Sequence, residues 1–253
     1  EMLSAMRAAT SAAQSIGTLL NTHANPDHTY GNQLVEGARI LSSQACLEEM
    51  REQMDSSRRG NLRRDWKKMG DAGAFFNEVM FSRFSSEPVS LTLPTESFSG
   101  ELSIFVGEKE IRLIEVGPAH TRGDVIAYVP ADKTVFTGDM IFVGGHPIVW
   151  EGPFENWIKT CDMMLSWDIE TVVPGHGPVT DKSGIRAVRD YLILVRREAR
   201  ARYDAGMDYV EAARDIELAP FADWIDSERL VINVFKCYRE FSGDDGPYDR
   251  IEL

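Results

Sequence analysis

The sequence predicts an α/β protein with a polar site where several strands end. The apolar positions Ile16, Leu19 and Leu20 precede the polar segment 21–28, which is typical of a buried strand that ends in a turn before a helix. Three later apolar runs end similarly, in a Gly or Pro followed by a polar residue: 111–116 before His120, 134–137 before Asp139, and 171–173 before His176. Open α/β sheets bind ligands at the carboxyl ends of their strands, so these side chains should converge.

The residue types at these strand ends indicate a metal site. His23, Asp27 and His28 lie within six residues, and four of the five histidines of the chain follow apolar runs. A single histidine in such a place is more often a satisfied core or surface group. Four strand ends that carry imidazole or carboxylate groups favour coordination of a metal ion.

Composition narrows the class of partner. The 253 residues are 43% hydrophobic and 26% charged, as in globular proteins, and the net charge is -13. This charge disfavours nucleic acid and anionic membranes, and therefore favours a small-molecule substrate. No stretch is as long and apolar as a membrane span. The three separated cysteines (Cys46, Cys161 and Cys237) predict packing rather than disulfides, and hence a cytoplasmic location.

One domain, 1–243, is expected, followed by an acidic tail, 244–253. An apolar stripe at Met2, Met6, Ala9, Ala13 and Ile16 predicts an opening helix. Strands are expected at 39–41, 89–93, 102–106, 111–116, 125–129 and 134–136. Residues 44–86 resemble a helical insertion, which is either a lid over the site or a helical surface. The C-terminal part, 182–241, is predicted to be helical, with one apolar face at Ile185, Val188, Leu192, Val195 and Ala199.

Four motifs carry a family resemblance. Segments 23–28 (HANPDH), 117–121 (GPAHT), 136–139 (FTGD) and 174–178 (PGHGP) resemble, in order, the metal-ligand motifs of the metallo-β-lactamase superfamily. The resemblance covers about residues 16–180. It implies a four-layer αββα sandwich that holds one or two divalent ions at one rim of its sheets, with zinc expected first and iron or manganese as alternatives.

One ligand position departs from the family pattern, in which the first motif is His-x-His-x-Asp-His. The resemblance implies two ligand groups that share Asp139: His23, Asn25 and His120 for the first ion, and Asp27, His28 and His176 for the second. Asn25 replaces a histidine, and an amide oxygen is a poorer zinc ligand than imidazole. Whether the site holds one ion or two therefore stays open.

The start of the chain departs as well. Members of this superfamily open with several strands, which are missing before the first motif here. We therefore expect a separate polypeptide to supply these strands, since an open sheet edge invites aggregation, and we expect an oligomer.

The resemblance implies a metal-dependent hydrolase. An ion held by imidazoles and carboxylates lowers the pKa of bound water from ~16 to about 7, which provides a nucleophile at neutral pH. The expected substrate is a small molecule with an ester, thioester, lactone, amide or activated aryl-ether bond. The last option reflects a similarity to dinitroanisole O-demethylase-type ether hydrolases, which contain more than one kind of subunit.

Two catalytic residues are expected beside the ligands: Asp27 as ligand or proton acceptor, and Asn25 as a group that orients the nucleophile or polarises the substrate. Candidate pocket residues are Tyr30, Phe142, His146 and Trp150, although surface exposure is favoured for His146. Three alternatives stay open: a phosphodiesterase, an iron-dependent oxygenase, and a non-catalytic binding subunit whose metal site has decayed.

Overall fold

The computed structural model describes residues 2–55, 91–244 and 246, and in this part of the chain two sheets lie face to face. The smaller sheet is parallel, in the order β1 (Thr18–Leu20), β2 (Arg39–Ser43), β3 (Glu96–Phe98). The larger sheet follows chain order through β4 (Glu101–Val106), β5 (Lys109–Glu115), β6 (Val125–Val129), β7 (Thr134–Phe142) and β8 (Thr171–His176). Its pairs are antiparallel except β7 with β8. These two parallel neighbours both direct their carboxyl ends to one rim of the sheet.

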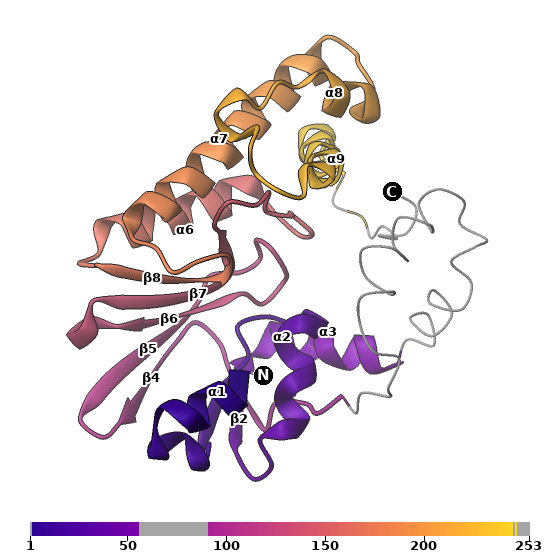
Figure 1. The fold of residues 1–253 in the computed structure, drawn as a ribbon. Coiled ribbons are helices and arrows are strands. Elements are labelled where there is room, and N and C mark those ends of the chain that lie inside the picture. The colour runs from indigo at the N-terminus through magenta and orange to yellow at the C-terminus, as the bar shows by residue number, and fades with distance from the viewer. Residues whose placement is uncertain (1, 56–90, 245, 247–253) are drawn as a thin grey trace.

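Helices cover the outer face of each sheet. α6 (Phe154–Ser166), α7 (Lys182–Asp204), α8 (Tyr209–Asp215) and α9 (Leu230–Ser242) lie over the larger sheet, and α1 (Met2–Ala9), α2 (Pro26–Thr29) and α3 (Gln44–Asp55) lie beside the smaller one (Figure 1). In the part of the chain that the structure describes, 3-10 helices occupy 11–14, 30–34, 130–132, 219–221 and 227–229. The predicted αββα sandwich is confirmed.

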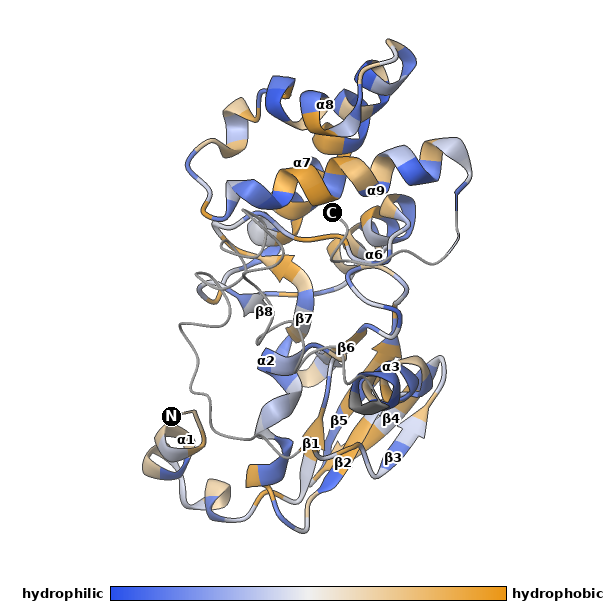
Figure 2. Ribbon diagram, turned by 90° about the vertical axis from the view of Figure 1, so that its right-hand side faces the viewer, coloured by the Kyte–Doolittle hydropathy of each residue, from blue (hydrophilic) through white to orange (hydrophobic). Residues whose placement is uncertain are grey.

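Three apolar clusters hold the layers together. Leu41 from the smaller sheet packs against Leu113, Val125 and Ala127 of the larger sheet, which joins the two sheets. A larger cluster fills the space between the other face of β5–β8 and helices α6, α7 and α9. Hydrophobic residues are prominent in β6 and β7 and in parts of α7 and α9 (Figure 2). The third lies beside α3 and contains Ala24, Cys46 and Met50. Burial of these faces fixes the layers because each fully buried aliphatic side chain contributes about 1.5–3 kcal/mol.

The predicted elements agree with the structure in most places. The apolar face of α7 is confirmed, since Ile185, Val188, Leu192, Val195 and Ala199 are all fully buried. All three cysteines are buried and unpaired, as the packing interpretation predicted. Residues 44–55 of the expected insertion form α3, and the rest of that segment lies outside the described residues, as does most of the tail 244–253. No helix in the described ranges is long and apolar enough to cross a membrane.

Two element predictions were wrong in detail. Residues 91–93 of the strand expected at 89–93 form no strand, and the smaller sheet instead gains 96–98, after Pro94. Leu91 and Leu93 pack against the cluster beside α3, so their apolar character reflects burial without strand pairing. The predicted apolar stripe runs from Met2 to Ile16, but the opening helix α1 ends at Ala9. None of its described residues is buried, and Met2 is 76% exposed.

Candidate metal centre

The segment after β1 brings the first group of ligand-type side chains to the rim. Asn21 N donates to Leu41 O at 2.9 Å, which continues the parallel pairing, and Val125 N donates to Thr22 O at 2.7 Å, which ties this segment to the larger sheet. His23 follows and is buried. Asn25 then precedes α2, and Pro26 stands in its first turn, where a missing N–H has no cost. The short helix turns His28 back toward His23, and their ring centroids are 4.3 Å apart.

Two glycines let β7 and β8 deliver their side chains to the same place. Gly138 has φ +50° and interrupts the pairing register with β8. The sequence predicted that Asp139 follows the end of its strand, but β7 continues to Phe142, so Asp139 lies inside β7. Gly175 lies against the Asp139 carboxylate, and any Cβ at residue 175 would overlap Oδ1 of Asp139. His176 is the last residue of β8. The two strands therefore place a buried carboxylate and an imidazole side by side.

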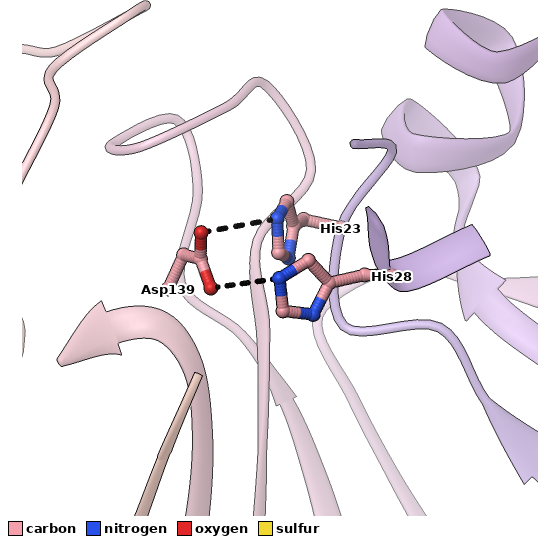
Figure 3. Close-up of side chains that lie close together, drawn as sticks. All are labelled: His23, His28 and Asp139. Carbon is pink, nitrogen blue, oxygen red and sulfur yellow. Dashed lines mark ion pairs between the residues drawn. The ribbon is translucent and has the colours of Figure 1, made fainter. Parts of the chain in front are cut away.

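Asp139 is the centre of the cluster. Its Oδ2 atom lies 3.2 Å from Nε2 of His176 and 3.3 Å from Nε2 of His120, and its Oδ1 atom lies 3.2 Å from Nε2 of His28. His23 Nε2 is 3.6 Å from Oδ2. Figure 3 shows His23 and His28 pointing from the segment after β1 toward the Asp139 carboxylate. All four predicted histidines therefore converge on one carboxylate.

Asp27 extends the cluster toward solvent. Its Oδ2 atom lies 3.3 Å from His28 Nε2 and 3.5 Å from His176 Nε2. The Asp27 side chain is 47% exposed and that of His176 is 43% exposed, whereas Asp139 is only 3% exposed. The centre thus has a buried end at Asp139 and an open end at Asp27 and His176.

The carboxylates of Asp27 and Asp139 set the protonation of His28 and His176, the two histidines nearer the open end of the centre. Burial lowers the pKa of His28, but hydrogen bonds to Asp139 and Asp27 outweigh it and raise that pKa to about 10. Hydrogen bonds to the same two carboxylates raise the pKa of His176 to about 9. Burial alone would raise the pKa of Asp139, yet its contacts with His176 and His28 hold it well below its usual range. The outer half of the centre therefore attracts positive charge.

His23 and His120, the two fully buried histidines of the centre, are neutral. Burial lowers the pKa of His23 to about 3 and also lowers the pKa of His120. His120 Nδ1 lies 2.7 Å from the carbonyl oxygen of Ile148, which can only accept, so Nδ1 carries the proton and Nε2 presents its lone pair. Asn25 Nδ2 lies 2.9 Å from that Nε2 and donates to it. Asn25 thus contacts His120.

The donor set fits a divalent metal ion. Within the described ranges, His23 Nε2 is a buried atom without a hydrogen-bond partner, an arrangement that costs free energy unless a ligand satisfies it. Two groups bring their ligand atoms within 4.8 Å of one another: His23, His28 and Asp139, and Asp27, His28 and His176. Neutral imidazoles with carboxylates are ligands that zinc, iron and manganese accept.

The four predicted pocket residues have different environments. The Phe142 ring stacks on the His176 imidazole, with centroids 5.0 Å apart. Tyr30 follows α2 directly and is half-buried, and Trp150 is half-buried with its backbone N–H donating to His120 O at 3.2 Å. His146 was expected at the surface and is instead 1% exposed, because its Nδ1 lies 3.0 Å from the Tyr191 hydroxyl beneath the C-terminal helices.

Two supporting groups were missed from the sequence. Thr22 Oγ1 lies 3.0 Å from His23 Nδ1, and the Ile148 carbonyl fixes His120. Such partners orient a ligand imidazole by engaging its second nitrogen. The position of Thr22 next to His23 in the sequence could have indicated the first contact. The second contact comes from a backbone carbonyl 28 residues from His120 along the chain, and no sequence pattern indicates it.

We expect Phe142→Leu to weaken metal affinity about tenfold, because the ring that holds the His176 imidazole in place is lost. Metal titration with a competing chelator measures this change. The matched control is Phe221→Leu, since Phe221 belongs to the same apolar cluster but packs edge-to-face against Tyr191 and Trp224. Equal affinities of the two variants would contradict a role for Phe142 in positioning His176.

Fold and centre together define an αββα protein with a histidine and aspartate cluster at the rim between its sheets. Residues 5–176 match the family described as the metallo-beta-lactamase superfamily, and the chain belongs to that superfamily.

Solved structures share the fold. A metallo-beta-lactamase from Pontibacter korlensis has 17% sequence identity and a TM-score of 0.53, covering 76% of this chain and 74% of that chain. The inverting sec-alkylsulfatase Pisa1 from Pseudomonas sp. has 13% identity and a TM-score of 0.67, covering 94% of this chain but 44% of the sulfatase. A double mutant of that sulfatase gives a TM-score of 0.68 at 13% identity, with 92% and 43% covered. This chain thus spans less than half the length of the sulfatase.

Proposed function

We propose that this protein is a metal-dependent hydrolase of small molecules. The observation that carries the proposal is the convergence of His23, His28, His120 and His176 on the buried Asp139 carboxylate, at distances of 3.2–3.6 Å. An ion held by these residues would supply a Lewis acid and would lower the pKa of a water molecule, so that hydroxide would be available at neutral pH. We propose zinc as this ion, with iron and manganese as the alternatives to test.

The exposure of the cluster supports a direction of substrate approach. Asp27 and His176 are the members most open to solvent, so the substrate reaches the centre from their side. The Asp27 carboxylate lies at this open end and is positioned to accept a proton when the nucleophile forms. Hydrogen bonds from His176 and His28 keep its pKa low, against the opposing effect of burial, so it is ionised at neutral pH.

The proposed substrates are small molecules with an ester, thioester, lactone, amide or activated aryl-ether bond. The structural similarity to a sec-alkylsulfatase adds sulfate esters to the panel that should be tested. The net charge of -13 supports a small molecule over nucleic acid. Three buried, unpaired cysteines support a reducing compartment such as the cytoplasm.

Metal removal tests the proposal. We expect dialysis against a chelator to abolish hydrolysis of the panel, and addition of single metals to restore it in the order of their fit to the centre. A second measurement, metal content by mass spectrometry, links activity to bound ion. Hydrolysis that persists without bound metal would refute the proposal. Activity that returns only with iron and consumes oxygen would favour the oxygenase alternative.

A further inference from the structure

Asn25 contacts one of the histidines of the centre. Its Nδ2 atom is 2.9 Å from His120 Nε2. His120 is fully buried, and its Nδ1 donates to the Ile148 carbonyl, so the Nε2 lone pair is the acceptor of the Asn25 hydrogen bond. A neutral imidazole nitrogen has one lone pair. It cannot accept this hydrogen bond and bind an ion at the same time.

The two clusters of ligand atoms overlap at His28. One consists of His23, His28 and Asp139, the other of Asp27, His28 and His176, and His120 belongs to neither. His28 Nε2 faces Asp139 Oδ1 at 3.2 Å, Asp27 Oδ2 at 3.3 Å and His176 Nε2 at 3.4 Å. Once deprotonated, this nitrogen offers a single lone pair to a metal ion. The two clusters therefore cannot each hold an ion through His28.

We infer that this chain binds one metal ion around His28 and Asp139, and that Asn25 keeps His120 out of its ligand set. This inference rests on the proposed metal-dependent function and specifies its centre. Asn25 is then a positioning residue that ties the His120 imidazole to the segment after β1. Because His28 can serve one ion only, a second ion on the side of His23 would need the His120 lone pair that Asn25 engages. The Asn25 amide offers only a poor ligand in exchange.

Metal stoichiometry tests the inference. The full chain is loaded with zinc, passed over a desalting column, and its zinc content is measured by mass spectrometry and by calorimetric titration. We expect one zinc per chain. We expect Asn25→His to bind two, because the new imidazole joins His23 and His120 and the shared Asp139 carboxylate. Leu34→His adds an imidazole at a 64% exposed position and should stay at one.

A second variant examines His120 directly. We expect His120→Ala to keep one zinc, provided its circular dichroism spectrum matches that of the parent chain, whereas His28→Ala should lose it. Two zinc ions in the parent chain, one zinc in Asn25→His, or loss of zinc in folded His120→Ala would each overturn the inference. Two ions in the parent would leave the proposed hydrolase standing. A parent chain that binds no zinc, and no iron or manganese in the same assay, would overturn the inference and the proposed function together.

Discussion

Asp139→Ala is expected to remove the bound metal and to lower hydrolytic activity at least about 10³-fold. Among the described residues, only Asp139 has a carboxylate that contacts all four clustered histidines. A bound ion contributes several kcal/mol to transition-state stabilisation, and each ~1.4 kcal/mol corresponds to a factor of about ten in rate. Metal content and initial rates on the substrate panel measure the effect. Asp139→Asn keeps the side-chain volume but removes the charge, and should also lose the metal.

The matched control for this substitution is Asp168→Ala. Asp168 lies just before the amino-terminal end of β8, whereas His176 ends that strand, and its side chain is 76% exposed in an ion pair with Lys133. Exposed ion pairs contribute little to stability, so this variant should keep its metal and its activity. If the complex assembled with Asp139→Ala kept the activity of the parent complex, this chain would be a non-catalytic binding subunit with a decayed site.

Gly175→Ala is expected to disrupt the centre without changing any ligand. The added Cβ would overlap Asp139 Oδ1 and lie 2.7 Å from the carbonyl carbon of Gly138, so either β8 or the carboxylate must move. Overpacking of this kind costs about 1–3 kcal/mol of stability. We also expect metal affinity to fall about 10- to 100-fold, because the displaced carboxylate no longer faces the histidines. Chemical denaturation and metal titration measure the two effects separately.

Gly17→Ala serves as the control for Gly175→Ala. A Cβ at Gly17 would meet no atom within 4 Å, and its backbone is not in the left-handed region. This variant should match the parent in stability and metal affinity. If Gly175→Ala behaved in the same way, the close approach of β8 to Asp139 would have no role in the centre.

Local sequence predicted most of the helices and strands, because the signals for these elements are periodic and short, whereas the αββα arrangement was implied by the family resemblance. The apolar face of α7 repeats at helical spacing, and Gly or Pro marks the ends of the strands that precede the site residues. The same reasoning failed at 91–93, where Leu91 and Leu93 pack against the cluster beside α3 without joining a strand. The same reasoning predicted surface exposure for His146, which is buried, because no residue near His146 in the sequence indicates its contact with Tyr191.

By itself, the sequence determined the order of the elements, the family resemblance and the residue types that gather at one rim. Only the tertiary structure decided which atoms of those residues meet. Asn25 and His120 are 95 residues apart along the chain, and their contact follows from the packing of the two sheets against each other. The physical reason is that the type of a residue limits which bonds its side chain can form. Which of these bonds forms depends on the distance and direction between the two groups, and long-range packing sets both to within about an ångström.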